Sequence, residues 1–133
     1  MDPADVAEVW AAMHKTPEEA LEISKTASRE TWAGRVHGEA VCVFGISQRM
    51  ILDYAGTPWL LGTPEIQDHP RAFLSASRRW VQLKMRDFTI LENFVDVRHT
   101  RAVRWLGWLG FTLEDPKPYG LDNLPFHHFY MKA

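Results

Sequence analysis

Cysteine is nearly absent from this chain of 133 residues, in which Cys42 is the single example. One cysteine cannot form an internal disulfide, so the sequence fits a reducing compartment such as the cytosol. It also excludes a cysteine-based zinc site. The six histidines show no ligand spacing, and the adjacent His127 and His128 would point to opposite faces of a strand. We therefore predict that the protein binds no metal.

Long apolar runs and a strong excess of charge of one sign are missing as well. No run approaches the ~20 apolar residues of a membrane-spanning helix, and the N-terminus carries no signal-peptide pattern. The net charge is −2, whereas a general nucleic-acid binder is clearly basic. We therefore expect a single globular domain over residues 1–133 that has neither a membrane span nor nucleic acid as a partner.

The first third of the chain changes from helical to strand-like spacing. Residues Val6, Val9, Trp10 and Met13 give the first helix an apolar side and carry it to about His14. A second helix begins at a capping box formed by Thr16 and Glu19 and supplies a further apolar side. Two strand-like runs over residues 31–37 and 40–46 then meet at a glycine-containing turn, which predicts a hairpin.

The middle of the chain contains two shorter strand-like runs and a helix. The runs cover residues 50–54 and 58–63, and the Gly-Thr-Pro sequence of residues 56–58 predicts a break between them. Pro70 stands at the first position of a helix that extends towards residue 85. A buried strand over residues 88–96 follows, because this run is rich in β-branched and aromatic residues.

The end of the chain begins with a short helix that directly follows this strand. Its apolar residues recur at three- and four-residue steps as far as Leu109, and Gly110 stands where a glycine ends a helix. A strand over residues 112–114, a proline-rich loop and a final strand over 126–131 complete the chain. The order α-α-β-β-β-α-β-α-β-β predicts an α/β (α+β) fold, with helices on the faces of a mixed sheet.

This order resembles the fold of the GNAT superfamily of N-acetyltransferases. The most specific likeness is in Ala102, Gly110 and Phe111, which match a family pattern of Asn-x-x-Ala followed by Tyr-x-x-x-Gly-Phe. Relative to that fold, the first strand, β1 of the family, is missing or very short. The resemblance implies an acyl-CoA-dependent N-acetyltransferase that takes acetyl-CoA as cofactor and an amine as substrate.

Two parts of the family pattern differ in this sequence. His99 and Leu106 occupy the asparagine and tyrosine positions, and leucine cannot protonate the leaving thiolate as that tyrosine commonly does. The glycines of the family's phosphate loop are absent between Gly62 and Arg71, where Pro64 and Pro70 remove two backbone donors. The resemblance therefore implies a degenerate coenzyme loop.

A narrower resemblance is to small GNAT-like proteins of tailed phages, which include the internal virion proteins of T7-like phages. It rests on residues 43–45, 58–63, 101–106 and 129–131. This likeness implies an alternative function, that of a catalytically inactive virion or host-interacting phage protein that retains the fold. Its partners would be phage or host proteins, and it would be found in the host cytosol or in the virion.

A ligand cleft is expected where the strands over residues 58–63 and 88–96 part, because ligands favour such points in sheets with parallel strands. Asn93 and Asp96 would orient an amine or act as a base, and Tyr130 would replace the missing acid, as would Tyr54 or Tyr119. An ordinary role in capping or at the surface is the competing interpretation. The candidate cofactor-binding residues are Leu60, Leu61, Gly62, Arg71 and His99.

Three arginines at three-residue spacing, Arg98, Arg101 and Arg104, share one side of the last helix. A basic face built around them would suit nucleic acid or the phosphates of a coenzyme, and a solvated helix surface is the simpler interpretation. The other members of such a face would be Arg78, Arg79, Lys84 and Arg86.

Overall fold

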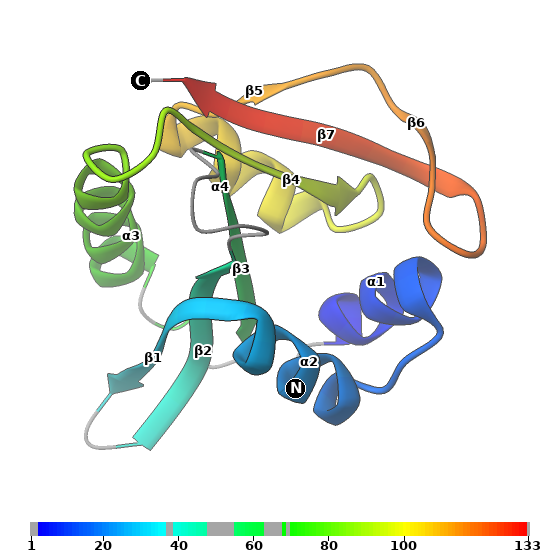
Figure 1. Ribbon diagram of the computed structural model, residues 1–133, viewed down its shortest axis with the longest axis horizontal. Helices are drawn as coiled ribbons and strands as arrows, with labels where there is room; N and C mark the ends of the chain where they lie inside the picture. The colour runs from blue at the N-terminus through cyan, green and yellow to red at the C-terminus, as the bar shows by residue number, and fades with distance from the viewer. Residues whose placement is uncertain (1–2, 37–38, 48–54, 63–67, 69, 133) are drawn as a thin grey trace.

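The protein is represented by a computed structural model that describes residues 3–36, 39–47, 55–62, 68 and 70–132. Its elements follow one another in the order shown in Figure 1. They are α1 (Pro3–Met13), α2 (Pro17–Ala27), β1 (Ser28–Val36), β2 (Glu39–Ser47), β3 (Ala55–Gly62), α3 (Pro70–Lys84), β4 (Ile90–Asp96), α4 (Thr100–Leu109), β5 (Thr112–Leu113), β6 (Lys117–Tyr119) and β7 (Leu124–Lys132).

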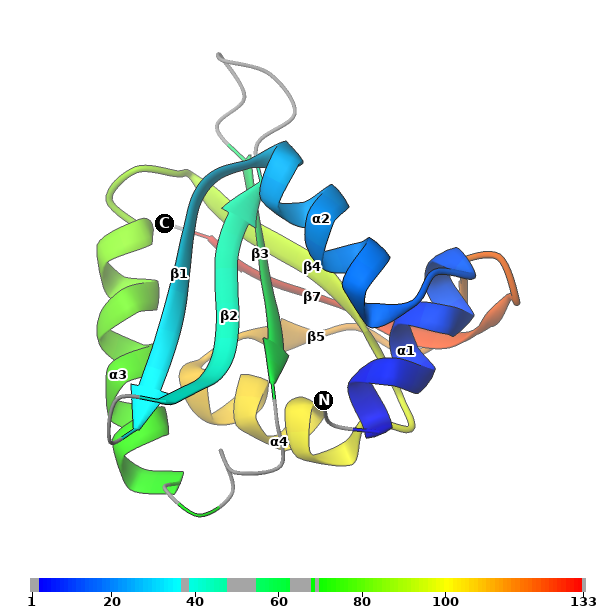
Figure 2. The same cartoon turned by 90° about the horizontal axis from the view of Figure 1, so that it is seen from below.

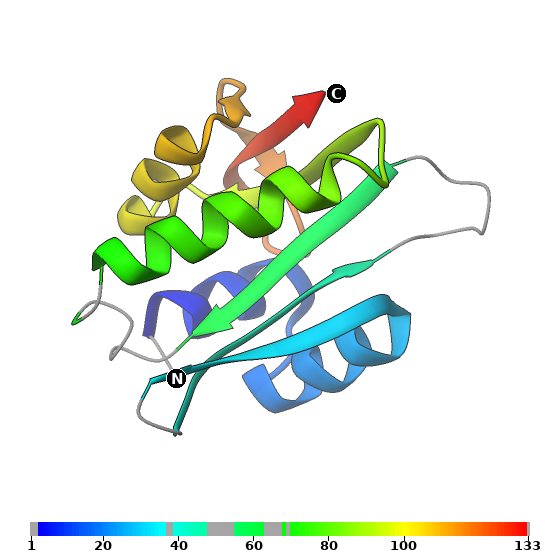
Figure 3. The same cartoon turned by 90° about the vertical axis from the view of Figure 1, so that its left-hand side faces the viewer.

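The strands form one seven-stranded sheet in the order β1-β2-β3-β4-β7-β5, with β6 paired to β7. Among the described strands only β3 and β4 run parallel, and the other pairs are antiparallel. Helices α1 and α2 lie on one face of the sheet and α3 and α4 on the other, as Figure 3 shows. The predicted mixed sheet and the element order are therefore confirmed, with β6 as one additional short strand.

The predicted helix ends are confirmed by their hydrogen bonds. Thr16 N donates to Glu19 Oε1 over 3.1 Å and Glu19 N donates to Thr16 Oγ1 over 3.2 Å, which is the reciprocal capping box. Gly110 ends α4 in the left-handed region at φ 101°, and Phe111 N donates to Leu106 O.

The predicted break at residues 56–58 was wrong, because these residues lie inside β3. A Cβ at Gly56 would lie 2.6 Å from Ile46 Cδ1, so this glycine permits close packing and not a turn. Pro58 is the register partner of Ile46 on β2, and its carbonyl points to the opposite side, towards β4. The β3–β4 ladder has already ended at this residue. Its missing N–H is therefore not needed there. The predicted strand over residues 50–54 lies outside the described residues.

The proline-rich segment before the last strand is more ordered than the sequence suggested. Lys117–Tyr119 forms β6, which pairs with the first residues of β7, so Pro118 lies opposite Pro125. Two prolines are tolerated in this pair because β6 is an edge strand that pairs on one side. Strand β7 accordingly begins at Leu124, earlier than predicted.

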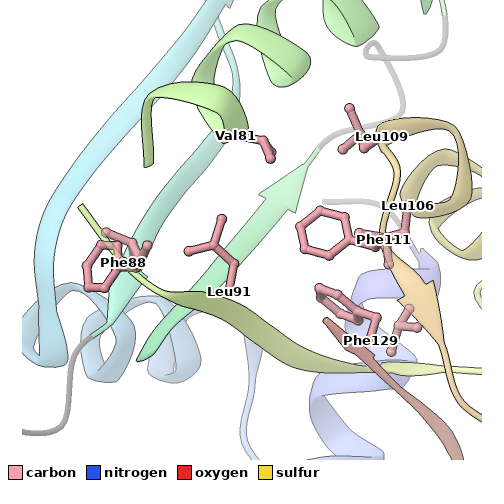
Figure 4. Close-up of a cluster of buried hydrophobic side chains, with 9 residues drawn as sticks. Val81, Phe88, Leu91, Leu106, Leu109, Phe111 and Phe129 are labelled. Atoms are coloured by element: carbon pink, nitrogen blue, oxygen red, sulfur yellow. The ribbon is translucent and has the colours of Figure 1, made fainter. Parts of the chain in front are cut away.

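The main core lies between the sheet and the helices α3 and α4. In Figure 4, Val81 of α3 and Leu106 and Leu109 of α4 lie over Leu91 of β4 and Phe129 of β7. Leu91 is fully buried. Within the described residues, no helix is both long and apolar enough to cross a membrane.

Candidate functional site

Strands β3 and β4 part soon after they meet. They pair at Ala55–Ile90 and Gly56–Leu91 and at no later described residue. Beyond this point Asn93 Nδ2 donates to Pro58 O over 2.7 Å, so a side chain replaces the next backbone contact. Since peptide groups of a strand alternate in direction, those of Leu60 point to the same side as the Pro58 carbonyl and have no strand partner there. The parted strands thus leave a free backbone edge in the middle of the sheet.

A cavity of about 700 Å³ opens at this gap and is lined from both helix layers. Figure 2 shows the two layers, with α1 and α2 on one side of β3 and β4 and with α3 and α4 on the other. Most of its lining side chains are apolar, and the volume is typical of pockets for small molecules or cofactors. Two sets of its lining residues carry polar groups at buried positions, and we call them the acid wall and the tryptophan wall. Asn93, Arg101 and Arg104 also line the cavity.

The acid wall consists of Asp5 and Glu8 on α1 and His99 at the start of α4. Asp5 is 6% exposed, and its Oδ2 accepts a hydrogen bond from Gly62 N over 2.9 Å. Its Oδ1 lies 2.7 Å from His99 Nε2. Both carboxylate oxygens are therefore engaged, and Asp5 ties together α1, the end of β3 and the start of α4.

Glu8 follows Asp5 by three residues on the same side of α1 and lines the cavity. Its Oε2 accepts a hydrogen bond from Asp96 N over 3.0 Å. Burial raises the pKa of Glu8 from 4.5 to about 7, against the lowering effects of that hydrogen bond and of His99. Glu8 is thus a carboxyl group that can take up or release a proton near neutral pH.

Of the acid wall, the sequence pattern indicated His99 but not Asp5 and Glu8, because the expected inward side of α1 was the wrong one. The expected apolar side included Val6, Trp10 and Met13, yet these side chains are 39%, 53% and 40% exposed. The inward side carries Val9 together with the two carboxylates. Three-residue spacing of Asp5 and Glu8 was the available signal, but spacing alone does not distinguish an inward pair of acids from a solvated one.

The turn between β6 and β7 holds α1 in this orientation. Leu121 N donates to Ala12 O over 3.1 Å and Asp122 N donates to Ala11 O over 3.2 Å, so the turn satisfies carbonyls at the end of the helix. Gly120 has φ 77°, and a Cβ there would lie 2.6 Å from Ala12 Cα. Glycine is therefore required at this contact for both conformation and space.

Asp96, a candidate base, is tied up in an ion pair. It is 1% exposed, and its carboxylate accepts hydrogen bonds from the Arg98 guanidinium, the shortest at 2.6 Å. Burial raises the pKa of Asp96, but the hydrogen bonds and charge of Arg98 outweigh it, so the pKa lies below its usual value. Asp96 also lies outside the lining of the large cavity.

The other candidate catalytic residues lie in different places. Asn93 lines the cavity, but its Nδ2 donates to Pro58 and its Oδ1 accepts from Phe94 N over 2.8 Å. Tyr130 is outside the lining and stacks with His128. Tyr119 lines the cavity and stacks on Phe94 with ring centroids 4.0 Å apart. Tyr54 lies outside the described residues.

Four of the five candidate cofactor-binding residues lie at the cavity. They are Leu60, Leu61, Gly62 and His99. The fifth, Arg71, is an exposed residue of the first turn of α3 and is not among the lining residues. The segment predicted to hold the coenzyme's phosphates, including residues 63–67, lies mostly outside the described residues.

The seven arginine and lysine residues that were expected to build one basic face have different surroundings. Arg98 pairs with Asp96, Arg78 donates to Trp108 O over 3.2 Å, and Lys84 is buried beside Asp87. Arg101 and Arg104 instead line the cavity with their exposed side chains. In the described part of the chain, no group of three or more His, Cys, Asp or Glu side chains is placed to hold a metal ion.

The tryptophan wall consists of Trp80 on α3 and Trp105 on α4, both of which line the cavity. Trp80 packs edge-on against Phe44 at 5.5 Å, and Trp105 stacks on Phe73 at 5.1 Å. The Nε1 atom of each indole is buried, and neither has a hydrogen-bond partner among the described residues. An unpaired buried donor costs about 1–3 kcal/mol, so these two N–H groups need an explanation.

The sequence matches no protein-family model and no curated protein. Solved structures do match the fold. Spermidine N-acetyltransferase from Vibrio cholerae, in complex with CoA and spermine, aligns over 89% of this chain and 76% of its own, with a TM-score of 0.66 and 14% identity. An acetyltransferase of the GNAT family from Streptococcus pneumoniae aligns over 90% and 77%, with a TM-score of 0.63 and 15% identity.

A third similar structure is an aminoglycoside acetyltransferase in complex with coenzyme A. It aligns over 84% of this chain and 70% of its own, with a TM-score of 0.64 and 14% identity. Sequence identities this low establish the fold alone. The chain therefore has the GNAT acetyltransferase fold that its sequence resembles.

Proposed function

We propose that the protein is an acyl-CoA-dependent N-acyltransferase, with acetyl-CoA as donor and an amine as acceptor. The observation that carries this proposal is the parting of β3 and β4 after two paired residues, which leaves the peptide edge of Leu60 facing a largely apolar cavity of about 700 Å³. Acetyltransferases of the same fold in complex with CoA, one of them also with spermine, support the choice of donor and acceptor.

The donor's pantetheine arm would lie in the gap between β3 and β4. Leu60 offers an N–H and a carbonyl on this side, whereas the neighbouring groups are engaged: Pro58 O binds Asn93, and Gly62 N binds Asp5. Arg101 and Arg104 on α4 line the cavity and would meet the phosphates of the coenzyme. They offer positive charge to a coenzyme whose usual glycine loop is absent from this sequence.

Glu8 is the proposed general base. When bound, acyl-CoA would supply a thioester, and the acyl group would pass to the amine nitrogen with release of the thiol. Glu8 lines the same cavity, and its pKa of about 7 allows it to accept the amine proton near neutral pH. Tyr119, which also lines the cavity, is the proposed proton donor to the thiolate, since Leu106 at the family's tyrosine position is buried in the core.

The alternative function, an inactive virion or host-interacting phage protein, has one observation in its favour. Leu106 belongs to the buried cluster between the sheet and α4, so the side chain at the usual acid position packs in the core and has no proton to donate. The cavity and the proton-accepting Glu8 are not needed for such a role. A phage origin would be compatible with either function, and the binding measurement below separates the two functions.

The proposal is tested by titrating acetyl-CoA into the protein and measuring both heat and thermal unfolding. A ligand at one hundred times its dissociation constant raises the free energy of unfolding by about 2.7 kcal/mol, so binding at millimolar acetyl-CoA gives a clear increase in melting temperature. Release of free thiol with a panel of amines would then report turnover. No shift and no heat at millimolar concentration would overturn the proposal and leave the non-catalytic alternative.

A further inference from the structure

Helix α1 bridges the last residues of the two parted strands. Asp5 accepts a hydrogen bond from the end of β3, and Glu8 accepts one from Asp96 N at the end of β4. The next residue, Val97, donates its N–H to Pro125 of β7, so the alternating peptide groups direct Asp96 N to the opposite side, towards β3. Two carboxylates of one helix thus engage the free edges of both strands.

The two acids differ in how much of each carboxylate is left for a ligand. Asp5 is buried, and both of its oxygens already have partners, Gly62 N and His99 Nε2. Glu8 is partly exposed and lines the cavity, and only its Oε2 has a hydrogen-bond partner among the described residues. Within that part of the chain, no other Asp or Glu side chain lines the cavity. One carboxyl group, that of Glu8, is therefore left to receive an amine.

The accessible side chains on the same face of the sheet are largely apolar. Val95 belongs to the core beneath α3 and α4, so its neighbour Phe94 points to the opposite face, on which α1 lies (Figure 3). Phe94 is 37% exposed, and it lines the cavity together with Tyr119, which stacks on it. Met13 of α1 is a further lining residue and is 40% exposed. A ligand on this face meets a single carboxyl group beside an apolar surface.

A second positive charge on such a ligand would find no counter-charge among these side chains. Transfer of an ammonium group from water to an apolar surface without a partner is strongly unfavourable. The basic side chains Arg35, Arg101 and Arg104 also line the cavity, and they repel a further cation. Methylene groups, in contrast, gain free energy when they leave water for this surface.

We propose that the acceptor is an amine with a single basic nitrogen on an apolar body, whose nitrogen meets Glu8 and whose body lies against Phe94 and Met13. This inference rests on the proposed function and names the substrate class of the same site. Polyamines are poor acceptors for this protein, although they carry the amine that the reaction needs.

The test compares hexylamine with 1,6-diaminohexane, which differ only in a second amine at the far end, and adds spermidine as a longer polyamine. Release of thiol from acetyl-CoA gives kcat/KM for each. The value for hexylamine is expected to exceed those for the other two by about tenfold or more, because an unpaired ammonium group must be desolvated. Calorimetry of the three amines with the coenzyme A complex should give the same order of affinity.

A pair of variants at Met13 tests where the apolar body lies. Met13→Glu adds a carboxylate to the apolar surface, and Met13→Gln is the matched control of the same size without charge. Met13→Glu should raise kcat/KM for 1,6-diaminohexane relative to hexylamine by about fivefold, since the second ammonium gains a partner at an exposed position. Met13→Gln should keep the wild-type ratio. Melting temperatures of both variants check that they are folded.

The possible failures of this experiment are distinguishable. If the wild type acylates 1,6-diaminohexane or spermidine as well as hexylamine, this inference is overturned and the proposed function stands. An unchanged ratio in a folded Met13→Glu variant also overturns it, because the body of the acceptor then lies elsewhere. Binding of coenzyme A without turnover of any of the three amines overturns the inference alone. If the wild type does not bind coenzyme A, the proposed function fails and the inference fails with it.

Discussion

The two walls of the cavity differ in whether their polar groups are hydrogen-bonded within the protein. On the acid wall, Asp5 accepts from Gly62 and His99, and Glu8 accepts from Asp96, so the buried acids are held by other parts of the chain. On the tryptophan wall, the indole N–H groups of Trp80 and Trp105 remain unpaired within the described residues. The first wall therefore holds the ligand-free fold through hydrogen bonds, whereas the second contributes to it through ring packing against Phe44 and Phe73.

The comparison also separates the two walls by what each can do in a reaction. Glu8 has a pKa of about 7 and so exchanges a proton near neutral pH, while an indole N–H keeps its proton at any ordinary pH. Proton transfer can thus be assigned to the acid wall, and apolar packing to the tryptophan wall. Substitutions on the two walls should accordingly change different measurements.

The largest expected effect is that of Glu8→Gln on turnover. The amide oxygen can still accept from Asp96 N, but it cannot take up the amine proton, so kcat should fall about 10²- to 10⁴-fold. In the wild type, activity should rise with pH through a pKa of about 7, and this rise should be absent from the variant. Both are measured from thiol release over pH 5.5–9.

The control for that prediction is Glu18→Gln, since Glu18 is exposed on α2 and outside the cavity lining. It should match the wild type in rate and in pH dependence. Wild-type turnover in Glu8→Gln would remove Glu8 from the mechanism and would leave the acid wall with a purely structural task.

A second effect of Glu8 concerns the free energy of unfolding. Its pKa is about 7 in the folded state and near 4.5 in the unfolded chain, so the folded protein binds more protons between these values. The free energy of unfolding should therefore fall as pH rises from 4.5 to 7, by up to about 3 kcal/mol from this group, and stay lower above pH 7.

Urea unfolding at several pH values tests this sign. The quantity to compare is the difference between the wild type and Glu8→Gln, because the variant lacks only the ionisable carboxyl group of Glu8. Asp96 does not interfere, since its lowered pKa gives stability that is lost only as pH falls below about 3.8. Parallel curves for the two proteins would show that Glu8 is ionised normally in the folded state.

Removal of the other acid should weaken the fold itself. Asp5→Ala leaves Gly62 N–H and His99 Nε2 without their acceptor, and the free energy of unfolding should fall by about 2–3 kcal/mol. Asp5→Asn should lose roughly half as much, because a carboxamide offers one oxygen where the carboxylate offers two. Urea unfolding measures both. An Asp5→Ala variant as stable as the wild type would mean that the acid wall does not tie α1 to the sheet.

Much of the fold could be predicted from local signals in the sequence. Thr16 and Glu19 form the expected capping box, and Gly110 ends α4 in the expected left-handed conformation. These signals act within a few residues, so the sequence contains them directly. The break predicted at Gly56 and Pro58 was wrong because these two residues are set by packing and pairing with the neighbouring strands, and they form no turn.

The site was harder to predict, because it depends on contacts between distant segments. The gap at Leu60 followed from the expected parallel strands, but Glu8 becomes a proton acceptor only when α1 is docked against the end of β4. Likewise, nothing in the sequence indicates that the indole N–H of Trp105 has no hydrogen-bond partner among the described residues. Burial and hydrogen bonding of these side chains are properties of the tertiary structure, and periodicity does not contain them.

The smallest expected effect lies between the two walls, at Asn93. Its amide is engaged by Pro58 O and Phe94 N, so the structure gives it the task of joining the parted strands. Asn93→Ala should lower the free energy of unfolding by about 1 kcal/mol and change kcat less than tenfold. Urea unfolding and thiol release measure the two quantities. A hundredfold loss of kcat with unchanged stability would instead make Asn93 a group that orients the amine. In that case a residue at the gap between β3 and β4 would take part in the reaction together with the acid wall.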